Sequence, residues 1–361
     1  MSQPAVLCRW RETISSRFVH LSKPQALVLA LYSLGLALAR RCALAASAEA
    51  LAQWGKPDTI ERRLQRFLSN PRVDWAKSSQ ALAAWVLELF SGTLVVLLVD
   101  ETSLQDKLRV MSVCLAYRGR AIPLAWWCYR PHHWPKRQVA LIGELLQRVA
   151  EVMPSGKTVL VQADRGIGCS PGLLRRIEAL GWWYLVRVQG GVRLRLADGR
   201  CLAFRQLLPT AGGTWAGAVE AFQRAGWQSC WAVAYWKRSH PQPWLLLTNW
   251  PQARGPWYAM RMWEELAFRD LKSGGWQWQR SRVWDPAHAN RLWLVMALAY
   301  VWTLSLGTQV IRDKVLRREF SRGRRWAHSV FRLGLRLLRR AISLGRPLPC
   351  DLLLIPHVPI L

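Results

Sequence analysis

The sequence predicts an α/β protein in which a mixed sheet with helices on its faces follows a helical N-terminal region. Three observations support this fold class. Residues 1–90 read as helical. From residue 93, short apolar runs and amphipathic stretches follow in the order strand, strand, strand, helix, strand, helix, strand, which is typical of a sheet with flanking helices. Residues 190–250 then lose the helical signal and break into short β-like pieces, which indicates a β-rich insertion.

Within the N-terminal region, the segment SAEALAQWGKPDTIERRLQRFLSN (47–70) is the most informative. It predicts a short alanine-rich helix, a turn and a basic amphipathic helix whose N-cap is Asp58 or Thr59. This is a helix-turn-helix pattern, and we expect the three arginines of the second helix to contact DNA. These are Arg62, Arg63 and Arg66. An ordinary antiparallel helix pair gives the same pattern, so both interpretations stay open.

The central region, residues 91–310, contains two apolar strands that each end in an acid. TLVVLLVD (93–100) ends at Asp100, and TVLVQAD (158–164) ends at Asp164. Between and after them we expect a hairpin turning at Gly119, helices over 137–153 and 171–181, and a strand over 182–189. Ligands and metals gather at the carboxyl ends of such strands, so the two acids are candidate functional residues.

The charge balance points to a polyanionic partner. The 361 residues include 51 Lys and Arg against 22 Asp and Glu, a formal net charge of +29, yet 51% of the residues are hydrophobic. A chain with that much apolar material folds, and its charge favours nucleic acid over an anionic membrane surface as the partner. The 23 Trp residues suit base stacking, although most are expected to pack in the core.

Cysteine usage and apolar runs indicate a cytoplasmic location. The eight cysteines form no C-x-x-C pair and do not lie at zinc spacing from histidine, which excludes a typical structural zinc and fits a reducing compartment. The run at 292–311 is long enough to cross a bilayer, but a buried core helix has the same pattern. We expect the core helix and no membrane partner.

The C-terminal region, residues 311–361, is strongly basic and helical. In VFRLGLRLLRR, arginines occupy one helix face and leucines another. The arginines are Arg332, Arg336, Arg339 and Arg340. Contact with a DNA backbone, with a membrane surface or with solvent alone would each explain them.

A second candidate site lies in WYAMRMWEELAFRDLK (257–272). On a continuous α-helix, three side chains fall at about −60°, −20° and −40° from Tyr258. They are Arg261, Glu265 and Lys272. Arg269 lies near this face, whereas Glu264 and Asp270 lie off it. A carboxylate with two cations and a phenol suits a phosphodiester, and a solvated face with i,i+4 ion pairs is the alternative.

Asp100, Asp164 and Glu265 together suggest a metal site. Three converging carboxylates repel one another unless a cation compensates them. Oxygen ligands without His or Cys select Mg²⁺ or Mn²⁺, and two such ions about 4 Å apart hydrolyse phosphodiesters. The two aspartates could instead be turn residues or helix N-caps, and Glu101 could replace Asp100 as the functional acid.

These motifs resemble those of the DDE transposases of bacterial insertion sequences, in the insertion sequence four family. That family's signature is Tyr, two residues, Arg, three residues, Glu, six residues, Lys, and Tyr258, Arg261, Glu265 and Lys272 match every step. LLVDETSL and VQADRGIG resemble its two aspartate blocks, and the resemblance covers roughly residues 90–310.

The resemblance implies a ribonuclease-H-like catalytic core in which Asp100, Asp164 and Glu265 hold two Mg²⁺ ions. It implies an enzyme that cuts transposon ends, exposes a 3′-hydroxyl and joins it to target DNA. Tyr258, Arg261 and Lys272 would position phosphates. Double-stranded DNA with terminal inverted repeats, a homodimer in a synaptic complex and a cytoplasmic, nucleoid-associated location are the corresponding expectations. A catalytically inactive DNA-binding descendant of a transposase is the alternative; a membrane-associated protein and a different ribonuclease-H-like nuclease are less favoured.

Overall fold

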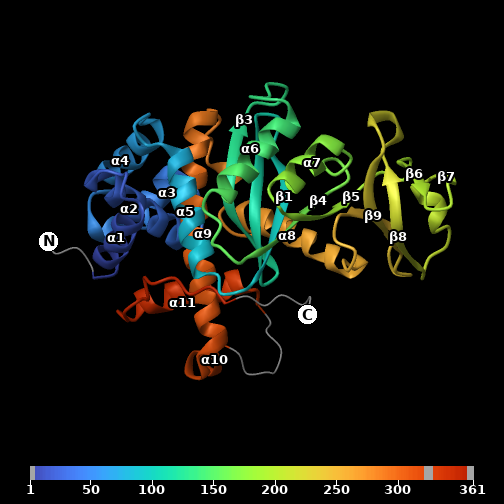
Figure 1. Cartoon of the computed structure of the whole chain (residues 1–361). Helices are drawn as coiled ribbons and strands as arrows, with labels where there is room; N and C mark the ends of the chain where they lie inside the picture. Colours follow the sequence, from blue (N-terminus) through green and yellow to red (C-terminus); the bar gives the residue numbers. More distant parts are fainter. Residues whose placement is uncertain (1–4, 321–327, 356–361) are drawn as a thin grey trace.

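The computed structural model describes residues 5–320 and 328–355 (Figure 1). It is a mixed α/β structure built on one ten-stranded, mostly antiparallel sheet with flanking helices. The strand order is β3-β2-β1-β4-β5-β10-β9-β8-β6-β7. The N-terminal helices lie at one end of the molecule and strands β6–β9 at the other (Figure 1).

The predicted helical N-terminal region is confirmed for the described residues. Its helices are α1 (Ala5–Arg17), α2 (Lys23–Ala39), α3 (Leu44–Glu49), α4 (Pro57–Ser69) and α5 (Trp75–Leu89). The predicted N-cap of α4 was wrong. Lys56 is the N-cap, without a side-chain cap bond, because Pro57 takes the first helical position, where its missing N–H costs nothing.

The predicted strands and hairpin of the central region are present. They are β1 (Leu94–Leu104), β2 (Leu108–Tyr117), β3 (Arg120–Tyr129), β4 (Thr158–Ala163) and β5 (Trp183–Arg187). β2 pairs antiparallel with β1 and β3, whereas β4 pairs parallel with β1 and β5. Arg118 and Gly119 both have positive φ, so the hairpin closes through a two-residue turn with the twist that such strands require.

The β-rich segment extends the same sheet. Its strands are β6 (Arg193–Leu196), β7 (Cys201–Ala203), β8 (Thr214–Ala221), β9 (Gln228–Tyr235) and β10 (Trp244–Thr248). β10 pairs antiparallel with β5, so backbone hydrogen bonds continue from the central strands into the inserted ones. The predicted helices of the central region appear as α6 (Gln138–Ala150) and α7 (Pro171–Ala179).

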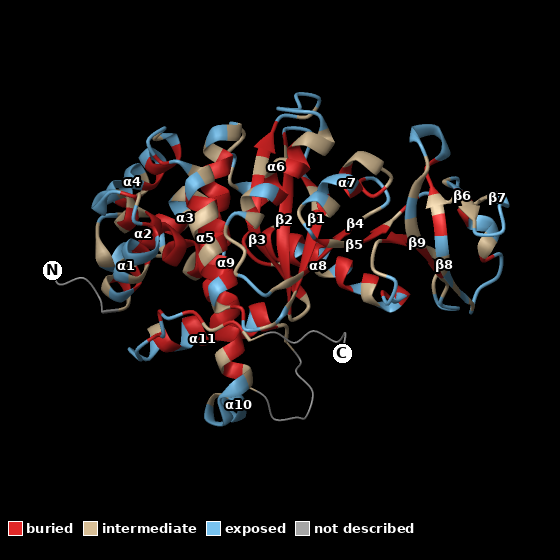
Figure 2. Ribbon diagram, in the orientation of Figure 1, coloured by how far each residue is buried: buried red, intermediate tan, exposed pale blue. Residues whose placement is uncertain are grey.

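The helix α9 (Pro286–Arg312) joins the N-terminal helices to the sheet. It contacts α2, α4, α5 and the edge strand β3, and it is buried through most of its length (Figure 2). Asn290 Oδ1 accepts the backbone N–H of Cys128, so the helix also satisfies a donor of the exposed sheet edge. By length and composition α9 could cross a membrane, but 89% of its most apolar window is buried inside the protein, as in a core helix.

The predicted continuous helix over 257–272 was wrong in its first part. Residues Gly255–Arg261 form a 3₁₀ helix, η4, and only Met262–Leu271 form the α-helix α8. In a 3₁₀ helix residues three apart eclipse, so Tyr258 and Arg261 still share one side. Lys272 is the C-cap of α8.

The basic C-terminal region forms α10 (Lys314–Phe320) and α11 (Val330–Ser343), and the segment 321–327 between them lies outside the described residues. The predicted two faces of α11 are present: its leucines are buried and its four predicted arginines are exposed. α11 approaches α9 closely at two glycines. A Cβ on Gly334 would lie 1.8 Å from the carbonyl oxygen of Thr303, and one on Gly307 would lie 1.9 Å from that of Val330.

We therefore expect Gly334→Ala to destabilise the fold. The added methyl group overlaps a backbone atom, which cannot rotate away, so α11 must move off α9 at a cost of about 1–3 kcal/mol. Thermal and urea unfolding measure this effect. Gly172→Ala is the matched control, because its nearest non-neighbouring atom would be at 3.7 Å, and it should change the free energy of unfolding little. Equal effects of the two substitutions would contradict the close packing of α9 and α11.

Candidate active site

The register of β1 and β4 brings Asp100 and Asp164 to the same level of the sheet. Val99 is the parallel partner of Ala163, so the two aspartates are the first residues beyond the paired segment of neighbouring strands. Partners at one level of a parallel pair point to the same face. The prediction that Asp100 ends its strand was wrong, because β1 continues to Leu104 in its hairpin with β2; only the pairing with β4 stops there.

Asp164 also has the turn role that the sequence left open. Its Oδ1 accepts the N–H groups of Gly166 at 2.9 Å and Ile167 at 3.2 Å, so the turn after β4 fixes the side chain. The second oxygen, Oδ2, has no hydrogen bond of this kind. A carboxylate held by one oxygen can present the other to a ligand.

Arg261 connects two of the predicted acids. Its Nη2 lies 2.7 Å from Asp100 Oδ2, and its Nη1 lies 3.5 Å from Glu265 Oε1. The guanidinium is almost completely buried, and its Nε and Nη1 make no hydrogen bond within the described structure. The contact with Glu265 is thus an ion pair without hydrogen-bond geometry. Buried donors without acceptors are costly, which makes them candidates to receive an anionic ligand.

Tyr258 is oriented toward the protein interior. Its hydroxyl donates to the carbonyl oxygen of Ala163 at 3.3 Å, directly before Asp164, and its ring packs edge-on against Trp244. Burial raises the pKa of this phenol. The contact ties η4 to the end of β4 and so fixes Arg261 above the aspartates.

The remaining residues of the predicted helix face differ in exposure. Glu265 and Arg269 are exposed. Lys272 is half-buried; burial lowers the pKa of its ammonium group, and the nearby charge of Asp100 opposes this effect. The structure thus brings Tyr258, Arg261, Glu265 and Lys272 to the Asp100 end of the sheet.

The electrostatics of Asp100 are those of a crowded carboxylate. Burial raises its pKa to about 6, and the negative charges of Asp164 and Glu265 act in the same direction. The guanidinium of Arg261 opposes them and keeps the shift moderate. Glu101, the alternative acid, lies on the opposite face of β1, where it forms an ion pair with Arg109 and accepts a hydrogen bond from Tyr129.

Glu264 was predicted to lie off the functional face, but it lies beside the strand partner of Asp100. This side chain is fully buried, and its Oε1 accepts a hydrogen bond from Ser112 Oγ at 3.2 Å. Ser112 is the register partner of Asp100 on β2. Burial, followed by the charge of Asp100, raises the pKa of Glu264 well above that of a free glutamate. The hairpin register around Gly119 was the available signal, since it places Ser112 beside Asp100.

The oxygen ligands at this end of the sheet suit a hard divalent cation, but Asp100, Asp164 and Glu265 do not lie close enough together to share one. Carboxylate oxygens are the ligands that Mg²⁺ prefers. Burial is the main cause of the raised pKa of Asp100, and the negative charges of Asp164 and Glu265, which a cation would neutralise, add to it. Nevertheless, no group of three His, Cys, Asp or Glu side chains in the described part of the chain is close enough to hold a metal ion. Arg261 lies between Asp100 and Glu265 instead, so Glu265 would have to turn away from it.

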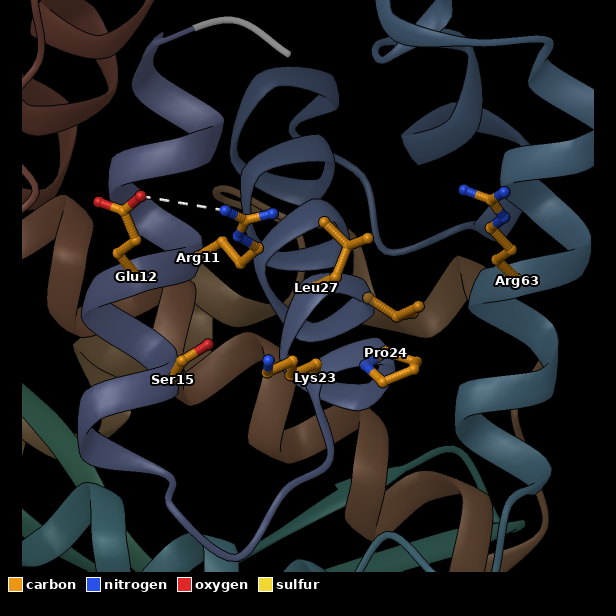
Figure 3. A pocket seen from close by; sticks show the side chains of 8 residues that line it. Arg11, Glu12, Ser15, Lys23, Pro24, Leu27 and Arg63 are labelled. Atoms are coloured by element: carbon orange, nitrogen blue, oxygen red, sulfur yellow. Dashed lines mark ion pairs between the residues drawn. The ribbon is translucent and has the colours of Figure 1, made fainter.

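The predicted DNA-contacting arginines of α4 lie in a separate part of the molecule. Arg62, Arg63 and Arg66 are exposed and belong to the N-terminal helices, away from the carboxylates (Figure 1). Arg63 lines an open cavity of about 860 Å³ between α1, α2 and α4. Figure 3 shows Arg63 on one helix and Lys23, Pro24 and Leu27 on another among the side chains that line this cavity. No two acids among the described residues line this cavity, so we assign the candidate catalytic site to Asp100, Asp164 and Glu265 and not to this cavity.

The buried carboxyl of Glu264 generates a stability prediction. A folded-state pKa above the unfolded value stabilises the fold below the unfolded pKa, and this contribution is lost as the pH rises through the folded pKa. Glutamine mimics the neutral acid. Glu264→Gln should therefore gain stability relative to wild type as the pH rises from about 4.5, measured by urea unfolding at several pH values. The same substitution at the exposed Glu265 is the control, and an unchanged difference across pH at Glu264 would contradict its burial as an acid.

Comparison with known families identifies the family of the chain. A family described as DDE superfamily endonuclease matches residues 18–121, and one described as Transposase DDE domain matches residues 136–302. The first match contains Asp100, and the second contains Asp164, Arg261 and Glu265. A search of curated proteins found no significant match. Two family matches in sequence order, over the elements that build the carboxylate site, show that the chain belongs to the DDE transposase family.

Proposed function

We propose that the chain cuts and joins DNA ends by metal-dependent phosphodiester hydrolysis and strand transfer, as a DNA transposase of the insertion sequence four type with a ribonuclease-H-like core. The observation that carries this proposal is the β1–β4 register, which sets Asp100 and Asp164 side by side beneath the buried guanidinium of Arg261. The family assignment supports the reaction class.

The residues of the site have different proposed roles. Asp100, Asp164 and Glu265 would hold two Mg²⁺ ions, or Mn²⁺, and the bound ions would supply activation of water and charge stabilisation at the leaving oxygen of the phosphodiester. Arg261 has unpaired buried donors for a phosphate oxygen of the DNA strand. Lys272 adds positive charge beside Asp100, and Tyr258 holds the backbone before Asp164.

Strand cleavage consumes only water and the phosphodiester. Water attacks phosphorus, the bond from phosphorus to the 3′ oxygen breaks, and that oxygen takes a proton to become a 3′-hydroxyl. In strand transfer the 3′-hydroxyl replaces water as the nucleophile. The neighbouring carboxylates are the groups that can accept the nucleophile's proton.

The partners follow from the reaction and the charge. Double-stranded DNA, with terminal inverted repeats and a target, is the substrate we propose for this +29 chain. Arg62, Arg63, Arg66 and Arg269 are exposed cations that can contact its backbone. We further propose a homodimer that synapses two ends, and a cytoplasmic, nucleoid-associated location.

One observation favours the alternative of a DNA-binding protein that no longer cuts. Arg261 already neutralises Asp100, and the three acids are not gathered into a metal-binding group in the described structure. In an active enzyme, DNA must draw Arg261 toward a phosphate and leave Asp100 to the metal. In an inactive one, the ion pair persists.

A cleavage assay separates the two functions. The substrate is a duplex carrying the flanking ends of the element, incubated with Mg²⁺ or with EDTA. We expect Asp100→Asn, Asp164→Asn and Glu265→Gln each to lower strand cleavage by at least about 10³-fold, because each removes a metal ligand. Glu49→Gln, at an exposed glutamate of the N-terminal helix α3, is the control and should retain cleavage. DNA binding without cutting in any divalent metal would support the inactive alternative.

The pKa of Asp100 gives a test that does not require activity. Because a proton and a cation compete for this carboxylate, Mn²⁺ affinity should fall about tenfold per pH unit below pH 6. Electron paramagnetic resonance titrations of free Mn²⁺ at pH 5, 6 and 7.5 measure this dependence. Asp100→Asn should bind more weakly and lose the pH dependence. Equal wild-type affinity at pH 5 and 7.5 would show that Asp100 is not a ligand.

A further inference from the structure

A second basic cavity lies at the other end of α8 from Glu265. Its volume is about 410 Å³, and three separate segments line it. β3 contributes Arg120, the end of α8 and the following loop contribute Arg269, Asp270, Ser273 and Gly274, and the start of α11 contributes His328, Ser329 and Arg332. Side chains distant in sequence thus converge on one hollow.

Among the described residues that line this cavity, the one acid is Asp270, and it is already neutralised. Asp270 forms a buried ion pair with Arg120 and accepts a hydrogen bond from Tyr300 at 3.1 Å. Arg269 and Arg332 form no ion pair with any carboxylate of the described residues. The cavity therefore carries two guanidinium groups that have no ion-pair partner among the described residues, beside the closed pair of Arg120 and Asp270.

The surrounding groups complete an oxyanion site. Ser273 and Ser329 supply hydroxyl groups, and His328 supplies a ring nitrogen. The cavity also adjoins the N-terminus of the 14-residue helix α11, whose dipole adds positive potential. Two like charges converging in a hollow repel each other, and an anion that accepts from both removes that cost.

We propose that this cavity binds a phosphate group. Two sources share this chemistry: a backbone phosphate of bound DNA, and a free phosphate or pyrophosphate. The first deepens the proposed function and rests on it, because it gives the DNA a second anchor on the side of α8 away from the carboxylates. The second would stand without it.

The sheet register gives the distance of this anchor from the cleavage centre. Ser112 and Tyr117 of β2 are the partners of Asp100 and Arg120, and they are 117 − 112 = 5 residues apart. Asp100 and Arg120 lie on the two strands that flank β2, so at about 3.4 Å per residue along the strands and about 4.8 Å per strand across them their backbones are about 20 Å apart. That is the rise of about six base pairs of duplex DNA, a length that one bound duplex can span.

The test compares two arginines of the same helix. Arg332 lines the cavity, whereas Arg339, also exposed on α11, does not. Binding of a 30-base-pair duplex is measured in EDTA between 50 and 200 mM KCl, so that cleavage plays no part. A contact with one DNA phosphate should lower the salt slope by about 1 in Arg332→Gln and in Arg269→Gln, while Arg339→Gln remains like wild type. Thermal unfolding confirms that each variant is folded.

A second experiment tests whether the cavity binds a free phosphate or pyrophosphate. Calorimetric titration with inorganic pyrophosphate should show one site in wild type that is lost in Arg332→Gln and kept in Arg339→Gln. Pyrophosphate binding with unchanged DNA salt slopes assigns the cavity to a soluble phosphate. Absence of both effects, or equal effects of Arg332→Gln and Arg339→Gln, overturns the proposal. If wild type binds no DNA, the proposed function fails, while the pyrophosphate titration still tests the cavity.

Discussion

The parallel pairing of β1 with β4 is the contact on which the candidate site depends. A one-residue shift in this register would send one of the two aspartates to the opposite face of the sheet. Several contacts resist such a shift. The β1–β2 hairpin fixes β1 from one side, the pairing with β5 fixes β4 from the other, and Tyr258 binds the carbonyl oxygen of Ala163.

The site concentrates charge that the fold does not fully compensate. Glu264 is fully buried and Asp100 is partly buried, and the positive charge of Arg261 acts on both carboxyl groups. A buried ion pair often contributes little net stability, because desolvation offsets the attraction. The unpaired donors of Arg261 and the unpaired Oε2 of Glu264 add to this cost. Such an arrangement is expected where function and not stability selected the residues.

The helices α9 and α8 have different structural roles. α9 joins the N-terminal helices, the edge strand β3 and α11 into one hydrophobic core. α8 crosses the sheet between the carboxylates and the second basic cavity, and it carries Glu265 at one end and Arg269 toward the other. A DNA strand held at both ends of α8 would be aligned over the acids by a rigid element, not by a loop.

The sequence by itself determined the order of the elements, because period, turn residues and caps are local. The helical N-terminal region, the hairpin at Gly119, the positions of β1 and β4 and the two-faced α11 could all be predicted, whereas the end of β1 at Leu104 could not. The spacing of Tyr258, Arg261, Glu265 and Lys272 is read directly from the sequence. Only the tertiary structure decided which residues meet. The strand register places Asp100 beside Asp164 and Ser112. Arg261 ends the 3₁₀ helix η4, and its side chain is buried. Packing buried Glu264, which the helix phase alone had placed off the site. Register and burial arise from contacts between segments far apart in the chain, so no local pattern contains them.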